Sequence, residues 1–580
     1  MDLKQISIVN FFNNLKTGQV IGLLILFGFL VYGNTFGNQL FWDDYNGIID
    51  NRYIKDWHYF PKYFTESLVA GSGLENNYWR PLVLLTFSLD YKLGGLDPFW
   101  YHWQNLFWHL LSVSGLFLLL KEFRFSQFVS FLTALLFLVH PLQTEAVTYV
   151  SGRAEPLYLT CLFFGLLFFI KGSKQIIQKN KTKEYGFSLL LFILGLLVKE
   201  RIVILIPLLI MHSFLNGQNW QQRRKYFLLI VPFVVLFIGY IILRTTVLHF
   251  SDNFILDTQV NIQTLAWWQQ ILVYIKAVAL SGWLIFWPNN LHMFRTIFPP
   301  NNWWDILLGS GLVGIVLFIY LGYRLRKNRR LFFFYWWIIL FILPSFYTFR
   351  MHGYWYEHWL VGLLPGVFVM IFYLLEKIYQ YGIKSDLKKI FFLIILVMPF
   401  IFYIIQTIKR NAEWENPIRF YEINIQRQGV GSIIYNNLGR AYFNKGEYAK
   451  AKEMYEKALE VNPTMYQAWY NLGNLYLQLA YFDKALSAYE RTLAINKYFV
   501  PAYHNIAVVY DRQGKQAEAI DFLERVSREV FPIPPMGIWY DLAVFSLKDG
   551  QKEKAHYYFN KVFEKNPDDP MVKQLEELMK

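Results

Sequence analysis

The stretch YFLLIVPFVVLFIGYIILRT occupies residues 226–245 and directly follows the basic triplet Arg223-Arg224-Lys225. Within the stretch the only charged residue is Arg244, near the end. A helix of about 20 apolar residues crosses the hydrocarbon core of a bilayer. The stretch therefore predicts a membrane-spanning helix that has a basic loop at its beginning.

Similar apolar runs recur through the first 410 residues. Hydrophobic residues make up 55% of the chain and charged residues 17%, which is too apolar for an average soluble protein. We predict about eleven spans, at 17–37, 104–121, 126–142, 155–171, 185–199, 201–216, 226–245, 303–323, 331–348, 357–376 and 388–407. The first run lacks a small-residue cleavage site, so we expect it to be retained as a span.

Basic residues cluster in alternate loops, which predicts the orientation. The clusters are Lys121 and Arg124; Lys171, Lys174, Lys179, Lys181 and Lys183; Arg223, Arg224 and Lys225; Arg324, Arg326, Lys327, Arg329 and Arg330; and Lys377, Lys384, Lys388 and Lys389. Such loops face the cytoplasm. The formal net charge of +14 therefore reflects membrane topology rather than nucleic-acid binding. The N-terminus is expected in the cytoplasm and the C-terminal part outside.

Residues 264–287 complicate this count, because one more crossing would move every later loop to the opposite side. We therefore predict a re-entrant or interface-lying helix on the outer side. Trp residues near both of its ends suit the headgroup level.

The end of the chain is a repeat array. Asn437-Leu438-Gly439, Asn471-Leu472-Gly473 and Asn505-Ile506-Ala507 recur at a spacing of 34, and Asp541-Leu542-Ala543 follows at 36. This is the period and pattern of tetratricopeptide (TPR) repeats. Stacked units of this kind form a solenoid with a concave binding surface. The sequence leaves little room for a full capping helix after the fourth unit.

The chain is thus expected to be all-α, with a polytopic membrane domain at 1–410, a linker at 411–433 and a TPR domain at 434–580. Cys161 is the single cysteine, which excludes an intrachain disulfide and a cysteine-based zinc site.

Polar residues of chemical interest gather on the predicted outer side. The first outer loop, about 38–103, carries Asp43 and Asp44, and cations and acids from other segments fall on the same side. They are Arg80, His140, Arg153, Glu155, Lys199, Arg201, His292, Arg295, Arg350, His352, Glu357 and His358. Ionisable residues at membrane level are costly and normally mark a site. The set predicts binding of an anionic, lipid-embedded substrate.

Each residue also has a simpler explanation. Adjacent acids on a loop are usually solvated, and Arg153 with Glu155 could be a structural bridge. Lys199-Glu200-Arg201 could cap a tight helical hairpin, and His140 before Pro141 could only end a helix. The shared sidedness favours the site.

Glycosyl transfer from a polyprenyl-phosphate sugar would use these groups. An acceptor hydroxyl needs a carboxylate to remove its proton, and we predict Asp43 as that base. The leaving phosphate needs cationic donors. A divalent metal such as Mg²⁺ or Mn²⁺, held by Asp43 and Asp44, could share this task.

Several motifs carry a resemblance to a known family. They are Phe41-Trp42-Asp43-Asp44, Trp79-Arg80-Pro81-Leu82, His140-Pro141-Leu142-Gln143-Thr144-Glu145-Ala146, Gly152-Arg153-Ala154-Glu155 and Lys199-Glu200. Together with the repeats, they resemble the transmembrane and TPR-containing O-mannosyltransferase family. The resemblance implies a GT-C fold and inverting transfer of mannose from dolichyl-phosphate mannose.

The resemblance places Asp43 where GT-C enzymes have the catalytic acid of the first outer loop, with Asp44 as the second acidic position. The match at Glu357-His358-Trp359-Leu360 is looser, because animal members tend to have Glu-Arg there. Animal members also have longer repeat arrays.

We therefore expect a membrane enzyme that moves a hexose, with mannose favoured, from a polyprenyl-phosphate donor to a Ser or Thr hydroxyl of a protein held by the TPR groove. Three alternatives stay open: a GT-C enzyme with a glycan or lipid acceptor, a non-enzymatic TPR scaffold, and a transporter.

Overall fold

The structure is a computed structural model that describes residues 12–74, 76–178, 180, 182–217, 219–250, 262–292, 294–300, 304–382, 385–428, 431–565, 567 and 570–579. It is almost entirely helical and divides into two units, Met1–Arg419 and Phe420–Lys580. The all-α prediction is confirmed.

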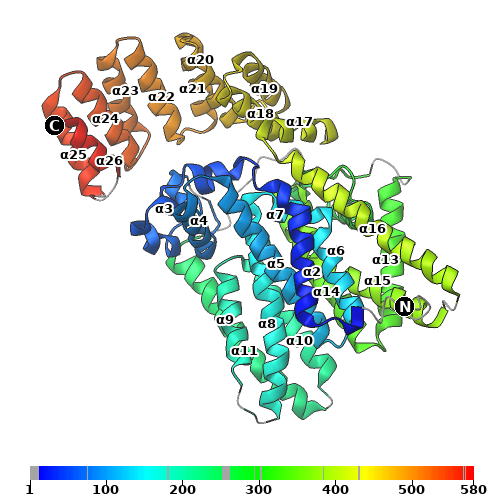
Figure 1. Ribbon diagram of the computed structural model, residues 1–580. Helices are drawn as coiled ribbons and strands as arrows, with labels where there is room; N and C mark the ends of the chain where they lie inside the picture. The colour runs from blue at the N-terminus through cyan, green and yellow to red at the C-terminus, as the bar shows by residue number, and fades with distance from the viewer. Residues whose placement is uncertain are drawn as a thin grey trace. The chain divides into compact units, whose positions relative to one another are not determined.

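The first unit is a bundle of long apolar helices (Figure 1). These are α2 (Thr17–Tyr32), α5 (Pro98–Glu122), α6 (Gln127–Val139), α8 (Ala154–Ile177), α9 (Glu184–Leu196), α10 (Leu205–Asn216), α11 (Trp220–Ile242), α12 (Trp267–Phe286), α13 (Ile306–Leu325), α14 (Arg329–His352), α15 (Leu364–Gly382) and α16 (Asp386–Glu413).

Short elements connect the long helices. They are η2 (Gly33–Thr35), η3 (Tyr45–Ile49), α3 (Arg52–Lys55), η4 (Trp57–Phe64), η5 (Ala70–Ser72), α4 (Pro81–Gly94), η6 (Pro141–Gln143), α7 (Thr144–Val147), η7 (Val150–Arg153), η8 (Glu200–Ile204), η9 (Leu243–Val247), η10 (Ile262–Thr264) and η11 (Glu357–Leu363). Two two-residue strands, β1 (Phe294–Arg295) and β2 (Trp355–Tyr356), pair antiparallel.

Among the described residues, nine helices are long and apolar enough to cross a membrane. A tenth span results if α6 and the helical residues after His140, which are bent by 54°, are taken as one. The chain is therefore a multi-pass membrane protein. The eleven predicted spans include α9 and α10, whose 13 and 12 residues fall short of the bilayer core, and leave out α12, which is one of the nine.

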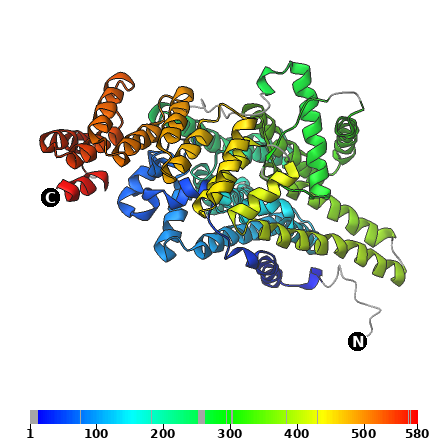
Figure 2. The same cartoon turned by 90° about the horizontal axis from the view of Figure 1, so that it is seen from above.

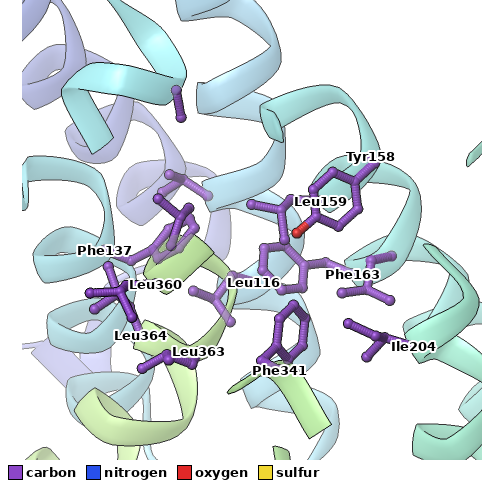
Figure 3. Close-up of a cluster of buried hydrophobic side chains, with 14 of the residues drawn as sticks. Leu116, Phe137, Tyr158, Leu159, Phe163, Ile204, Phe341, Leu360, Leu363 and Leu364 are labelled. Carbon is purple, nitrogen blue, oxygen red and sulfur yellow. The ribbon is translucent and has the colours of Figure 1, made fainter. Parts of the chain in front are cut away.

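The bundle has a continuous apolar interior. Leu116 of α5, Phe137 of α6, Phe163 of α8 and Phe341 of α14 are buried around one another, and Leu360 of η11 joins them (Figure 3). This core holds helices from distant parts of the sequence in one body.

Contacts at the two ends of the bundle join segments that are predicted to lie on the same side. At the end predicted to be inner, the Arg330 guanidinium donates to the Arg124 carbonyl, 2.5 Å away, joining two basic loops. At the end predicted to be outer, the Asn38 side chain donates to the Asn411 carbonyl (3.0 Å). Loops that alternate in sequence thus meet at the same end.

Helix α12 is the segment for which a re-entrant or interface-lying helix is predicted. It is one unbroken helix whose length and composition would also allow a span. The Tyr274 ring lies 5.2 Å from that of Phe346, near the C-terminal end of α14, and the Ile285 carbonyl lies 2.9 Å from His140 Nε2, just after α6. These contacts place α12 beside the ends of α14 and α6 that are predicted to be outer, and they are compatible with the predicted helix lying along that face.

The second unit contains four helix pairs, which follow one another in chain order (Figures 1 and 2). The pairs are α18 (Ser432–Asn444) with α19 (Tyr448–Val461), α20 (Tyr466–Gln478) with α21 (Phe482–Ile495), α22 (Val500–Arg512) with α23 (Gln516–Glu529), and α24 (Met536–Lys548) with α25 (Lys552–Lys565). Helix α17 (Pro417–Gln428) precedes them and α26 (Pro570–Met579) follows.

Small and large residues of the repeats fit as their pattern predicts. A Cβ added to Gly473 would lie 2.6 Å from the Tyr489 ring, and one added to Gly439 would lie equally close to Tyr455. Contrary to the sequence expectation, α26 has room to cap the array, since its Val572 and Leu575 are buried against the last pair.

The turns inside the repeats share a left-handed residue. Gly446, Gly514 and Gly550 have φ of 81°, 75° and 78°, and Ala480 occupies the equivalent turn of the second repeat with φ 58°. A left-handed backbone costs an L residue about 1–2 kcal/mol, whereas glycine adopts it freely. The second turn is therefore the strained one.

We predict that Ala480→Gly stabilises the repeat unit by about 1 kcal/mol, because it removes this steric cost. Gly446→Ala, the reverse change at the equivalent position, should destabilise it by a similar amount. Thermal unfolding of the detergent-solubilised chain, followed by circular dichroism and limited proteolysis, measures both. An unchanged or lower melting temperature for Ala480→Gly contradicts the prediction.

Candidate functional site

The first outer loop directs its two acids into different surroundings. Trp42 has a left-handed backbone, with φ 64°, which is unusual for a bulky residue. Asp44 is 2% exposed, whereas Asp43 is an exposed residue. Adjacent carboxylates that look alike in the sequence therefore have different roles open to them.

Asp44 anchors the loop. Its Oδ2 accepts a hydrogen bond from the Phe41 backbone N–H (3.1 Å). Its Oδ1 accepts from the Ser151 backbone N–H (3.0 Å) and from the Ser151 hydroxyl (2.5 Å). Burial raises the Asp44 pKa to about 7, although the hydrogen bonds from Ser151 and Phe41 oppose the rise. With both oxygens engaged, Asp44 fastens the loop to η7.

Asp43 keeps one defined partner and an open side. The Tyr149 hydroxyl donates to Asp43 Oδ2 over 2.7 Å. The Tyr149 ring stacks on Trp42, at 5.3 Å, and on Trp414, at 5.2 Å. Burial raises the pKa of Tyr149 well above its ordinary value, so its phenol stays protonated and donates.

The charge state of Asp43 follows from competing influences. Desolvation by the surrounding protein raises its pKa, while the Tyr149 hydrogen bond and the positive charge of Arg80 lower it. Because Asp43 is still exposed to solvent, water offsets part of the desolvation. We therefore take the carboxylate as the form present at neutral pH, which is the form that a general base needs.

Arg80 stands at the beginning of α4, close to this acid. Its guanidinium lies 4.5 Å from the centre of the Tyr78 ring, and its Nε is buried without a hydrogen-bond partner. Within the part of the chain that the structure describes, Arg80 has no ion pair and no hydrogen bond from its guanidinium. Such a cation is available to an anionic ligand.

The turn between α9 and α10 brings more charge next to Arg80. The Leu82 backbone N–H donates to the Leu197 carbonyl (3.2 Å), which ties the beginning of α4 to the end of α9. Burial raises the Glu200 pKa, but the positive charges of Arg80 and Lys199 lower it. The lowering prevails, so the pKa of Glu200 is below its ordinary value.

Protein groups use only some of the hydrogen-bond donors of Lys199 and Arg201. Lys199 forms an ion pair with the buried Glu155. Arg201 donates from Nη2 to the Ser345 hydroxyl (2.7 Å), while its Nη1 is buried with no partner among the described residues. The structure thus brings Arg80, Lys199 and Arg201 to one region, together with Glu155.

Arg153 does not belong to this region of available cations. It is 0% exposed and pairs with Asp90, also 0% exposed, at 2.5 Å. It also donates to Asn105 Oδ1 (2.6 Å) and to the Tyr101 carbonyl (2.8 Å). These contacts argue against the predicted role of Arg153 as a phosphate ligand, because the protein already uses its donors. They favour the alternative of a structural bridge, with Asp90 rather than Glu155 as the partner.

His140 is likewise structural. It is 0% exposed, its Nδ1 accepts from the Leu142 backbone N–H (3.2 Å) and its Nε2 lies 2.9 Å from the Ile285 carbonyl. Both ring nitrogens are occupied, which argues against His140 as a donor-phosphate ligand.

Four further predicted residues form pairs on the same face. Arg295 contacts Glu357 at 2.6 Å, and the His292 backbone N–H donates to the same carboxylate (3.1 Å). His358 Nδ1 lies 2.7 Å from Glu145 Oε1. Arg295 and Glu357 satisfy each other, which argues against a direct phosphate role for either. Arg350 is exposed, and the side chain of His352 lies outside the described part of the chain.

The predicted metal site has no support in the described residues. They contain no group of three or more His, Cys, Asp or Glu side chains placed to hold a metal ion. Since Asp44 already accepts three hydrogen bonds, a shared metal on Asp43 and Asp44 would displace the loop anchor. We propose no metal role for this pair.

Sequence reasoning missed Tyr149, Ser151 and Trp414, which support the two acids. Tyr149 and Ser151 lie between two quoted motifs, at Glu145 and Gly152, and that position is the only signal for them. Trp414 lies in the predicted linker, where nothing in the sequence singles it out.

Comparisons with known proteins bear on both units. Three tetratricopeptide-repeat family models match residues 432–465, 454–486 and 502–528. Two solved structures resemble part of the chain. MamA is 25% identical, with 26% of this chain and 86% of MamA covered and a TM-score of 0.23. The TPR protein YrrB is 18% identical, with 35% of this chain and 97% of YrrB covered and a TM-score of 0.24.

Curated relatives extend over both units. The chain is 24% identical over 458 residues to the Caenorhabditis elegans protein O-mannosyl-transferase F38B6.6, covering 77% of this chain and 63% of that protein. It is 24% identical over 488 residues to the human protein O-mannosyl-transferase TMTC3, covering 74% of this chain and 50% of TMTC3. The Xenopus laevis protein O-mannosyl-transferase tmtc2 is 40% identical over 133 residues, covering 22% and 16%.

The chain thus spans 63% and 50% of the length of the first two of these relatives. The similarity that the sequence motifs predict is confirmed: this chain resembles the protein O-mannosyltransferases of the transmembrane and TPR-containing family.

Proposed function

We propose that the protein transfers mannose from a polyprenyl-phosphate donor to a Ser or Thr hydroxyl of an acceptor protein, on a membrane unit of the GT-C type. One observation carries the proposal: an exposed carboxylate, Asp43, lies within the electrostatic reach of Arg80, a cation that has no ion pair and no hydrogen bond from its guanidinium among the described residues. Relatives named protein O-mannosyl-transferases support the choice of reaction.

Asp43 would act as the general base. The acceptor hydroxyl loses its proton to the Asp43 carboxylate as its oxygen forms a bond to C1 of the sugar. The bond between C1 and the phosphate oxygen breaks, and the electron pair leaves with the lipid phosphate. A single displacement of this kind inverts the anomeric centre.

The leaving phosphate gains negative charge, so cationic donors close to it lower the barrier. Arg80 and the unpartnered Nη1 of Arg201 are the groups best suited to this task, and Lys199 adds charge beside them. Glu155 holds Lys199 by ion pairing and would restrict its ammonium to this place.

The alternating basic loops favour an arrangement with the N-terminus in the cytoplasm and Asp43 on the exoplasmic side. The repeat unit, following the last predicted span, would then lie on the exoplasmic side as well. TPR arrays present a concave surface to peptides, and we propose that this one recruits the acceptor polypeptide.

The first test replaces the base. Asp43→Asn keeps the size of the side chain and removes its basicity, so we expect kcat to fall about 100- to 10,000-fold with little change in stability. Asp50→Asn, an exposed acid of the same loop, is the matched control and should retain activity. The assay follows transfer from polyprenyl-phosphate mannose to a Ser/Thr peptide; normal turnover by a folded Asp43→Asn protein would refute the mechanism.

The second test uses the pH dependence of the reaction. The Tyr149 hydrogen bond lowers the Asp43 pKa, so Tyr149→Phe should raise it. A base works only when deprotonated, and the acidic limb of kcat/KM should therefore move to higher pH. The control is Tyr91→Phe, which removes a phenol from α4 and should leave the acidic limb in place. A limb that stays fixed in Tyr149→Phe would show that another group titrates.

The third test addresses the phosphate. Arg80→Gln removes a charged donor, and because a hydrogen bond to a charged group contributes about 1.5–3 kcal/mol, we expect KM for the lipid donor to rise about tenfold or more. Lys92→Gln removes an equal charge at the exposed far end of α4 and serves as the control. Equal KM values for the two variants would exclude Arg80 from donor binding.

A further inference from the structure

The end of the last apolar helix, α16, interlocks with the loop that carries Asp43. The Asn34 side chain donates to the Ile408 carbonyl (3.0 Å), and the Gln39 backbone N–H donates to the Glu415 carbonyl (3.0 Å). Residues just before and just after the predicted linker boundary therefore hold the entry to the first outer loop.

Asn411 is the polar centre of this junction. It is 0% exposed; its Nδ2 donates to the Val31 carbonyl (2.8 Å), and its Oδ1 accepts from the Thr148 hydroxyl (2.7 Å). Its backbone carbonyl accepts from Asn38 Nδ2 (3.0 Å). One side chain thus joins the end of α2, the segment before Tyr149 and the end of α16.

Trp414 is the aromatic centre. It is 1% exposed, stacks on Tyr149 at 5.2 Å and 26°, and contacts the Phe41 ring at 5.7 Å. Trp42 also stacks on Tyr149, so removal of the Trp414 indole would leave one of the two stacked contacts of the ring whose hydroxyl donates to Asp43.

We propose that Trp414 is a positioning residue for Asp43: it fixes Tyr149, which in turn fixes the carboxylate. Trp414 lies three positions before α17 begins, and α17 continues into the repeat unit. The chain that enters the repeat unit is therefore also part of the support of the reacting acid. The proposal rests on the proposed function, in which Asp43 is the base.

Several groups face Asp43 and would shape its titration. Tyr149 donates to it, Arg80 and Asp44 supply charge from α4 and from its own loop, and Tyr78 and Tyr356 lie within electrostatic reach. Of these groups, Tyr149 stacks on Trp414. A change at Trp414 should thus reach Asp43 through the Tyr149 hydrogen bond.

The experiment compares Trp414→Ala, Trp414→Phe and Phe402→Ala in the full chain. Phe402 is the matched control, because it lies on α16, the helix that ends directly before Trp414, and stacks on Trp287, at 5.0 Å. Displacement of a reacting group by about 1 Å can cost on the order of 100-fold, so we expect Trp414→Ala to lower kcat about 10- to 100-fold with donor KM little changed. Trp414→Phe keeps a stacking ring and should recover most of the activity.

A merely structural role would not move the pH profile. We expect Trp414→Ala to shift the acidic limb of kcat/KM to higher pH, in the direction of Tyr149→Phe. The effects of two substitutions that break the same contact do not add. The double variant Trp414→Ala/Tyr149→Phe should therefore show no further shift of the acidic limb than Tyr149→Phe alone.

The outcomes separate the two proposals. Full activity in Asp43→Asn overturns the proposed function, and the positioning role with it. Loss of activity in Asp43→Asn, together with a Trp414→Ala protein that matches Phe402→Ala in kcat and pH profile, overturns only the positioning role. If Trp414→Ala does not fold, a Trp414→Leu variant with an unchanged pH limb overturns it as well.

Discussion

A charge inside an apolar helical bundle must be neutralised by the protein itself, because lipid offers neither hydrogen bonds nor a high dielectric constant. The membrane unit obeys this constraint at most of its buried ions. Arg153 has Asp90 and two carbonyl-type acceptors, Arg295 has Glu357, and Lys199 has Glu155. Among the described residues, Arg80 forms no such ion pair or hydrogen bond, although Glu200 and Asp43 lie within its electrostatic reach, and this points to a ligand. An arginine held beside an aromatic ring, with a buried Nε that nothing accepts from, has a cost that a bound anion would remove.

The sequence predicts features that depend on consecutive or nearby residues better than contacts between distant segments. The repeats could be predicted because their period, turn glycines and glycine–tyrosine contacts lie within 34-residue units. Most membrane helices could be predicted because hydropathy is a property of consecutive residues. The short helices α9 and α10 were counted as spans because hydropathy alone does not reveal where a helix ends.

The partners within the site are not local and could not be predicted in the same way. Arg153 and Glu155 are close in sequence, yet Arg153 turns towards Asp90 of α4 and Glu155 towards Lys199. A single sequence shows which residues are ionisable but does not show which helix faces they share. Asp43 could be proposed from its loop and its family resemblance, but its supports, Tyr149 and Trp414, come from segments more than a hundred residues away.

The division of labour between Asp43 and Asp44 shows how backbone geometry gives function to one of two identical side chains. Left-handed residues other than glycine carry strain that the surrounding structure must offset. At Trp42 two sets of contacts offset the strain. The Trp42 ring stacks on Tyr149, and Asp44, two positions later, accepts hydrogen bonds from Ser151 and Phe41. With Asp44 pinned inwards, Asp43 is left at the surface with one phenol to orient it. The same contacts that stabilise the strained turn therefore also place the base, so the loop cannot relax without losing the acid's orientation.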